Sequence, residues 1–186
     1  PTADDIGKIS KCDLFIYAGG ESDEWVEDAL KQAENKDMKV INMMEMLGDS
    51  VKEEEVVEGM EAEHDHDHDE DSEHDEDSGH DEESDHHDSD QEVEYDEHTW
   101  LSLKNAEVIC KAIENDLSSL DPEHKDLYKN NSVEYINKLS ELDSKYQEVV
   151  DDAARKTVLF GDRFPFRYLT DDYGLDYYAA FVGCSA

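Results

Sequence analysis

The sequence predicts an α/β protein with a parallel-sheet lobe that carries helices on both faces, a long connecting helix and the start of a second α/β lobe. A disordered insert rich in His and Asp interrupts the first lobe. Three observations carry this prediction. Helical and strand-like patterns alternate at the start of the chain, apolar residues recur at helical spacing after residue 102, and Ala62 is the only apolar side chain in residues 61–90.

The first element is a short helix. Thr2 is a suitable N-cap, and Asp4 and Asp5 fall in the first turn, where the helix dipole favours negative charge. Ile6 and Ile9 are three residues apart and share one face. We therefore expect a helix that begins directly after Thr2.

A strand, a helix and a second strand follow. Residues 14–18 are a continuous apolar run that ends at Gly19 and Gly20, the pattern of a buried parallel strand. Residues 23–33 predict a helix with one apolar face, formed by Trp25, Val26, Ala29, Leu30 and Ala33. Residues 40–43 predict the second strand, and this order is typical of a parallel sheet.

After the insert the pattern becomes helical. Ser102 is a suitable N-cap for a helix with an apolar face formed by Ala106, Ile109, Cys110, Ile113, Leu117 and Leu120. Pro122 ends that helix and begins another, since proline is tolerated at the first helical position. If unbroken over residues 122–150, the second helix is about 43 Å long at 1.5 Å per residue, which makes it a rigid connector.

The last elements repeat the α/β alternation. Residues 157–160 predict a strand, residues 164–172 a helix and residues 177–181 another strand. The neighbouring aromatic residues indicate core packing and not a ligand site. Three cysteines without paired spacing predict neither a disulfide framework nor a Cys-x-x-Cys metal site.

The charge balance excludes two classes of partner. The chain has 53 acidic and 16 basic residues, a formal net charge of −37, so it should repel nucleic acid and anionic lipid surfaces. No stretch approaches the roughly 20 apolar residues that span a bilayer. The first residues resemble no secretion signal, so any export signal is expected to be removed or to lie outside these residues.

The insert concentrates the charge and points to a metal. Between Glu61 and Glu97 there are 21 of the 53 acids, seven histidines and no Lys or Arg. Imidazole is a preferred ligand of zinc and copper, whereas calcium prefers oxygen, so we expect several weak, exchangeable transition-metal sites. The alternative is a solvated acidic linker with incidental histidines. The candidate ligands are His64, His66, His68, His74, His80, His86 and His87.

A second candidate lies just before the helix that Ser102 begins. His98 stands beside Asp96, Glu97 and Trp100. A lone histidine in a loop is more often structural than a ligand, and spacing alone leaves both interpretations open.

Four stretches together resemble the zinc and manganese substrate-binding proteins of bacterial ABC transporters. P-T-A-D-D-I and C-D-L-F-I-Y-A-G-G resemble E-P-S-P-x-D-I and A-D-L-x-x-x-N-G of that family. These two motifs form the first stretch, and the acidic histidine-rich loop is the second. The third stretch, D-E-H-T-W-L-S, resembles D-P-H-x-W-L-S, and the fourth, F-R-Y-L-T-D-D-Y-G-L, resembles F-x-Y-F-x-x-x-Y-G-L. The stretches occur in the family's order and cover essentially the whole chain.

The resemblance implies a division of the chain and a metal site between two lobes. Residues 1–121 would form the N-terminal lobe with a disordered loop at 58–95, residues 122–152 the connecting helix, and residues 153–186 the beginning of the C-terminal lobe. His98 matches a family ligand. Another family histidine would lie upstream of Pro1, and the place of a third is taken by Arg163, which cannot ligate. Asp162, a loop imidazole or a different site would have to compensate, and the chain is expected to be a fragment.

The implied function is capture of a divalent metal, with Zn²⁺ preferred and Mn²⁺ and Cu²⁺ as alternatives, and delivery to a membrane ABC permease. We expect a bacterial extracytoplasmic protein, either a cell-surface lipoprotein or periplasmic, monomeric and not an enzyme. The alternative is a metal-buffering or surface interaction protein whose His/Asp loop is the functional part. A metallohydrolase is disfavoured because H-E-x-x-H, G-x-S-x-G and phosphate-loop motifs do not occur. Whether Gly19 and Gly20 merely end a strand, the preferred interpretation, or line the cleft stays open.

Overall fold

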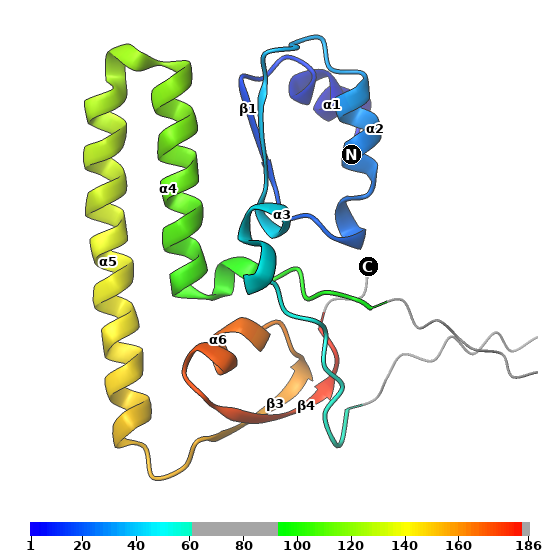
Figure 1. Cartoon of the computed structure of the whole chain (residues 1–186). Coiled ribbons are helices and arrows are strands. Elements are labelled where there is room, and N and C mark those ends of the chain that lie inside the picture. Colours follow the sequence, from blue (N-terminus) through cyan, green and yellow to red (C-terminus); the bar gives the residue numbers. More distant parts are fainter. Residues whose placement is uncertain (61–92, 184–186) are drawn as a thin grey trace, which may run out of the picture.

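The computed structural model describes residues 1–60 and 93–183. The seven candidate histidines of the insert and Cys184 lie outside the described residues. The described chain is an α/β structure with two separate two-stranded parallel sheets and a helical hairpin beside them (Figure 1). Within the described ranges, no helix is long and apolar enough to cross a bilayer.

The first sheet pairs β1 (Leu14–Tyr17) with β2 (Lys39–Asn42) in parallel, with Leu14 opposite Lys39 and Tyr17 opposite Asn42. Two short helices, α1 (Ala3–Ile9) and α2 (Trp25–Lys31), contact each other, and α4 (Leu103–Leu120) contacts β2. Figure 1 shows the two strands between α4 on one side and α1 and α2 on the other. The expected sheet lobe with helices on both faces is confirmed.

Local capping explains where these helices begin. The Thr2 hydroxyl accepts a hydrogen bond from the Asp5 N–H, and the Asp5 carboxylate accepts one from the Thr2 N–H, so α1 starts with a reciprocal capping box. Met43, expected in the second strand, instead begins the helix α3 (Met43–Leu47). The reason is the Asn42 side chain, which accepts a hydrogen bond from the Glu45 N–H and caps α3.

The expected helix at residues 23–33 is shorter in the structure. A 3₁₀ turn, η1 (Glu21–Asp23), precedes α2, which ends at Lys31. The predicted apolar face is confirmed at Val26, Ala29 and Ala33, which are buried, although Ala33 lies beyond the end of α2.

The helical hairpin joins α4 to the long helix α5 (Lys125–Asp152), and the two pack side by side (Figure 1). As predicted, Ser102 caps α4, since its hydroxyl accepts a hydrogen bond from the Asn105 N–H. Residues 122–124, expected inside the long helix, form a separate 3₁₀ turn, η4 (Pro122–His124). The 28 residues of α5 span about 42 Å.

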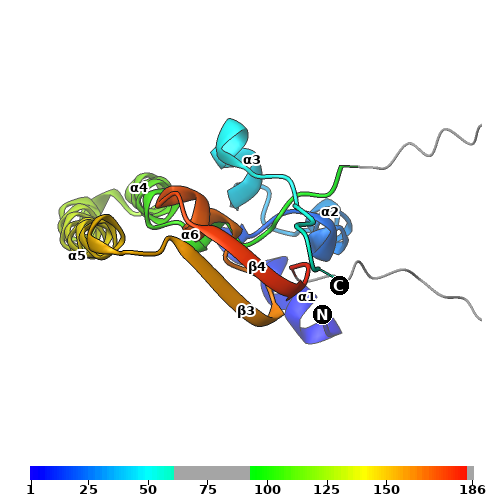
Figure 2. The ribbon, with the colours of Figure 1, turned by 90° about the horizontal axis from the view of Figure 1, so that it is seen from below.

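The second sheet pairs β3 (Thr157–Arg163) with β4 (Asp176–Phe181) in parallel, and α6 (Arg167–Asp172) connects them. Figure 2, which looks along the hairpin, shows β3 and β4 running side by side away from it. The helix expected at 164–172 starts only at Arg167. Phe164 is instead buried in a cluster where its ring stacks on that of Tyr177 with 3.8 Å between centroids.

A short pairing joins the two chain segments that flank the insert. Glu53 forms an antiparallel bridge with Tyr95, the Glu54 N–H donates to the Glu94 carbonyl, and the Asp96 N–H donates to the Lys52 carbonyl, each of these two bonds at 2.9 Å. Part of the loop expected at 58–95 is therefore regular backbone, because Glu94 and Tyr95 belong to this pairing.

Candidate metal centre

His98 lies between this pairing and α4. A 3₁₀ turn, η3 (Thr99–Leu101), follows it, and Ser102 then caps α4. The His98 carbonyl accepts a hydrogen bond of 3.0 Å from the Leu101 N–H. Ser102 is itself buried, and its hydroxyl donates a hydrogen bond of 2.6 Å to the Asp172 carboxylate on α6. The backbone on the C-terminal side of His98 is therefore tied to two helices.

The His98 imidazole is paired with the buried carboxylate of Asp96. Oδ1 of Asp96 accepts the backbone N–H of His98 at 2.7 Å and lies 3.0 Å from Nδ1 of the ring. The hydrogen bond between the Asp96 carboxylate and the His98 ring is the main reason that the pKa of His98 is raised above its ordinary value. Burial acts in the opposite direction. Only 14% of the His98 side chain is exposed.

This contact assigns the two ring nitrogens different roles. An ionised carboxylate only accepts hydrogen bonds, so Nδ1 must carry the proton that faces Asp96. In the neutral ring, Nε2 then has the free lone pair that a metal ion needs. No described residue forms a hydrogen bond with Nε2. The ring centroid of Trp100 lies 5.6 Å from that of His98.

Further carboxylates make the surroundings of His98 negative. Burial raises the pKa of Glu54, and the neighbouring charge of Asp96 raises it further, while His98 acts in the opposite direction. Glu97 accepts a hydrogen bond of 2.9 Å from the Ser22 N–H. Such a surrounding favours a divalent cation by simple Coulomb attraction.

The glycine pair after β1 turns the chain, as the preferred interpretation of the sequence expects. Gly19 and Gly20 have φ angles of 90° and 87°, a left-handed conformation that suits glycine and turns the chain. A Cβ added at Gly20 would overlap the Glu97 carboxylate. Gly20 therefore also lies against the residue that directly precedes His98.

The second candidate ligand, Asp162, lies on β3, where the register with β4 is irregular between Phe160 and Arg163. Its Oδ1 accepts a hydrogen bond of 2.8 Å from the Arg163 N–H. The Arg163 guanidinium donates to the Gly183 carbonyl at 3.4 Å. No hydrogen bond or ion pair joins Asp162 to His98 in the described part of the chain.

The described residues do not form a complete metal site. Over residues 1–60 and 93–183, no group of three or more His, Cys, Asp or Glu side chains is arranged to hold a metal ion. His98 is thus a single preoriented candidate ligand in this part of the chain.

Helix α6 holds the His98 segment from the other side. The Tyr168 hydroxyl donates to the Asp96 carbonyl at 2.6 Å and accepts the Lys52 N–H at 3.1 Å. Two ion pairs accompany these bonds, one between Arg167 and Glu55 and one between Lys52 and Asp171. Sequence reasoning missed these contacts and Glu54, because they depend on the pairing of the segments that flank the insert.

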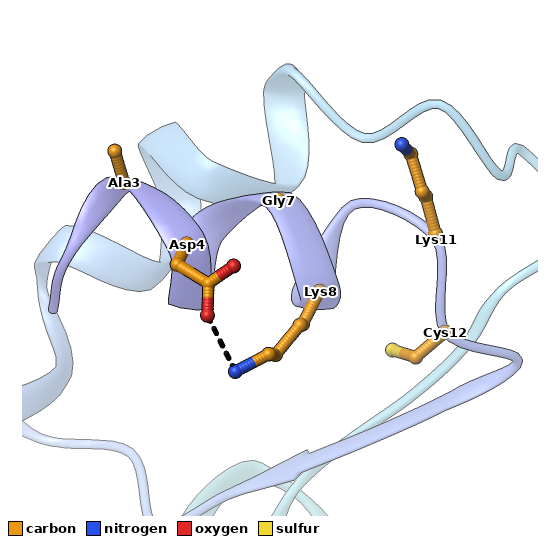
Figure 3. Close-up of a pocket in the computed structure, with 6 residues that line it drawn as sticks. All are labelled: Ala3, Asp4, Gly7, Lys8, Lys11 and Cys12. Atoms are coloured by element: carbon orange, nitrogen blue, oxygen red, sulfur yellow. Dashed lines mark ion pairs between the residues drawn. The ribbon is translucent and has the colours of Figure 1, made fainter.

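A hollow beside α1 has unsuitable chemistry for a metal. Figure 3 shows its lining, in which the Asp4 carboxylate is paired with Lys8 at 2.6 Å, with Lys11 and Cys12 further along the same open surface. Burial raises the pKa of the Cys12 thiol, which disfavours the thiolate that binds metals. We therefore place the candidate centre at His98.

Comparisons with known proteins give a consistent result. The whole chain, residues 1–186, matches the family model described as zinc-uptake complex component A, periplasmic, or ZnuA. The zinc-binding lipoprotein AdcA of Streptococcus pneumoniae is 32% identical over 175 residues, 94% of this chain and 30% of that protein. The high-affinity zinc uptake system protein ZnuA of Bacillus subtilis is 31% identical over 175 residues, 94% of this chain and 47% of that protein. The chain thus spans less than half the length of these relatives.

Solved structures agree with the fold. A zinc-bound variant of AdcAII from Streptococcus pneumoniae is 27% identical with a TM-score of 0.63, over 96% of this chain and 55% of that one. Zinc-bound AdcA from the same organism is 25% identical with a TM-score of 0.64, over 100% of this chain and 31% of that one.

Proposed function

Because this chain belongs to the ZnuA family of zinc-uptake components, we propose that it is part of an extracytoplasmic bacterial protein that captures Zn²⁺ and delivers it to an ABC permease. Zinc is the cargo and leaves unchanged, so we propose no catalytic step. The names of the relatives, a zinc-binding lipoprotein and a zinc uptake protein, support this cargo and a location outside the cytoplasm.

The observation that carries the proposal is the Asp96–His98 pair. The Nδ1–H of His98 is bound by a carboxylate, and its Nε2 has no hydrogen-bond partner among the described residues, which is the arrangement typical of zinc-ligating histidines. The surrounding acids Glu54 and Glu97 would raise the local concentration of the cation. We propose His98 as the first ligand of the cleft site.

The remaining ligands are proposed from the sequence. Zinc takes four ligands, and His98 supplies one. Asp162 could supply an oxygen, and the histidines of the insert, which lie outside the described residues, could supply imidazoles. We further propose that the insert collects zinc through several weak sites, because ligands tethered to the same chain raise the effective zinc concentration near the cleft.

A zinc titration of the full-length protein tests this function. The first variant replaces the seven insert histidines by Asn, which keeps the length and the charge of the insert. We expect it to bind fewer zinc ions while retaining one tight site. In this background His98→Ala should lower the zinc affinity by at least about 100-fold. Loss of a residue that is hydrogen-bonded to a metal ligand typically lowers metal affinity by about 10- to 100-fold, and loss of the ligand itself should lower it further.

His124→Ala is the matched control for that substitution. His124 forms the same kind of contact, with Nδ1 2.7 Å from Asp121 Oδ2, but it is exposed and lies in η4, beyond the C-terminal end of α4. It should not change zinc affinity. If only millimolar binding were found, unchanged by either set of substitutions, zinc capture would be wrong.

The same titration distinguishes the alternative function. A metal-buffering or surface interaction protein would lose all tight binding when the insert histidines are replaced, and His98→Ala would add nothing. Small-angle scattering with and without zinc gives independent evidence, since only capture in a cleft predicts that zinc changes the relative orientation of the lobes.

A further inference from the structure

Asp96 is fixed more firmly than an ordinary surface carboxylate. Only 3% of its side chain is exposed. Its own N–H donates to the Lys52 carbonyl at 2.9 Å, and its carbonyl accepts the Tyr168 hydroxyl at 2.6 Å. The Tyr168 hydroxyl also accepts a hydrogen bond from the Lys52 N–H. Lys52, Asp96 and Tyr168 are therefore joined in a closed ring of three hydrogen bonds, which fixes the backbone of Asp96.

The direction of the Asp96 side chain is fixed as well. Oδ1 accepts two hydrogen bonds from His98, one from the backbone and one from the ring. Two bonds to one oxygen define both the position of the His98 backbone and the rotation of its imidazole. Without the bond to the ring, the imidazole would be free to turn, and its proton would be free to exchange between the two nitrogens.

We propose that Asp96 is a positioning residue for zinc capture: it keeps His98 in the Nδ1–H tautomer and directs Nε2 towards the metal. The proposal rests on the proposed function, in which His98 binds zinc, and it adds a second residue to that site. We assign Asp96 to holding the ring and not to binding the metal, because Oδ1, the oxygen that faces His98, accepts two hydrogen bonds from that residue.

A purely structural role makes a different prediction. If Asp96 only stabilises the turn through the His98 N–H, its loss would lower stability but leave the ring tautomer and the zinc affinity of folded molecules unchanged. The test therefore reads out the His98 ring directly, and the insert histidines do not obscure it.

The experiment uses the full-length protein with ¹⁵N-labelled histidine rings, observed by long-range ¹H–¹⁵N NMR above the pH range in which imidazoles titrate. The His98 signals are assigned as those missing in His98→Gln. Metal-free natural protein should show His98 as Nδ1–H, and zinc should shift Nε2. Asp96→Ala should give a mixture of tautomers and a roughly 10- to 100-fold weaker zinc affinity at His98, measured with a competing chelator.

Asp96→Asn provides the rescue. Its amide oxygen still accepts hydrogen bonds but carries no charge, so it should recover part of the tautomer preference and of the zinc affinity. The control is Glu94→Gln, which removes one negative charge two residues before Asp96. In the described structure the Glu94 side chain has no hydrogen bond or ion pair with His98, so this substitution should change the zinc affinity less than about 3-fold.

The outcomes separate the two claims. If Asp96→Ala keeps the Nδ1–H tautomer and natural zinc affinity, the positioning role is wrong. If Asp96→Ala does not fold, Asp96→Asn decides, and zinc affinity equal to that of Glu94→Gln overturns the proposal. If zinc leaves the His98 signals of the natural protein unchanged, the proposed function fails, whereas the tautomer comparison still reports on Asp96.

Discussion

The hydroxyl of Tyr168 donates a hydrogen bond of 2.6 Å to the backbone carbonyl of Asp96, a residue 72 positions earlier in the chain. Tyr168 lies on α6, between the two strands of the second sheet, while Asp96 lies two residues before His98. Burial raises the pKa of Tyr168 to about 12, so the phenol stays protonated and remains a donor. The Tyr168 side chain therefore connects the backbone of the segment that carries the candidate ligand directly to α6.

Tyr168→Phe should weaken this connection. The substitution leaves the Lys52 N–H and the Asp96 carbonyl without their partner in a buried place, which costs about 1–3 kcal/mol for an unsatisfied group. We expect unfolding in urea at correspondingly lower denaturant concentration, together with weaker zinc binding. Tyr178→Phe is the control, because this half-exposed ring has no hydrogen bond to its hydroxyl in the described structure, and it should change neither quantity.

Local signals in the sequence were sufficient for most of the fold. Thr2 and Ser102 each begin a helix as predicted, and the apolar run after residue 13 is a parallel strand. The two caps depend on residues three positions apart, and the strand is signalled by an unbroken apolar run, residues 14–18. The errors lie where a single side chain decides a boundary, as when Asn42 caps α3 and turns Met43 from strand into helix.

The site was predicted only in part, for a physical reason. The sequence identified His98 as a candidate metal ligand, because a histidine next to acidic residues can be recognised from residue types alone. The roles of Tyr168 and Glu54 depend on the pairing of residues 52–54 with residues 94–96 across the insert. Nothing in the composition of an acidic, almost wholly polar insert indicates the register of the segments on either side.

Gly20→Ala should disturb the segment that carries His98. The new Cβ would occupy a left-handed backbone position and overlap the Glu97 carboxylate, for a total cost of roughly 2–3 kcal/mol. Gly48→Ala is a matched control, since Gly48 also has a positive φ but no atom lies within 4 Å of the place that a Cβ would take. Its cost should be the backbone contribution alone, about 1 kcal/mol.

The added cost at Gly20 should depend on Glu97. The double substitution Gly20→Ala and Glu97→Ala should recover part of the lost stability in urea unfolding, because the overlapping carboxylate is gone. Equal losses for Gly20→Ala and Gly48→Ala would show that Gly20 is only a turn residue.

Ser102→Ala should cost more than the loss of an ordinary helix cap. Ser102 accepts the Asn105 N–H and donates to the Asp172 carboxylate, and it is only 2% exposed. Losing a cap costs about 1 kcal/mol and losing a hydrogen bond to a charged group about 1.5–3 kcal/mol, so we expect a loss of roughly 2–4 kcal/mol.

Thr2→Ala is the comparison for that substitution, because Thr2 caps α1 at an exposed position. Its loss should stay near about 1 kcal/mol by denaturant unfolding. If both substitutions cost the same, the bond between Ser102 and Asp172 contributes nothing to the attachment of α6.

Acid should weaken the turn between α4 and α5. Asp121 accepts hydrogen bonds from the Tyr128 hydroxyl and from His124, and these bonds, that of Tyr128 foremost, hold the pKa of Asp121 below its ordinary value. Because the folded pKa lies below the unfolded one, the carboxylate stabilises the fold above about pH 4 and loses this effect as the pH falls through the folded pKa.

Asp121→Asn tests this dependence, because it keeps a neutral acceptor and removes the charge. It should lower the melting temperature at pH 7 by a few degrees at most, and the difference from the natural protein should shrink as the pH falls below about 4 and through the folded pKa. Glu123→Gln removes a neighbouring charge that has no hydrogen bond or ion pair in the described structure, so its melting curve should follow that of the natural protein. A difference for Asp121→Asn that persists unchanged to pH 3 would mean that the turn depends on the shape of the side chain and not on its ionisation.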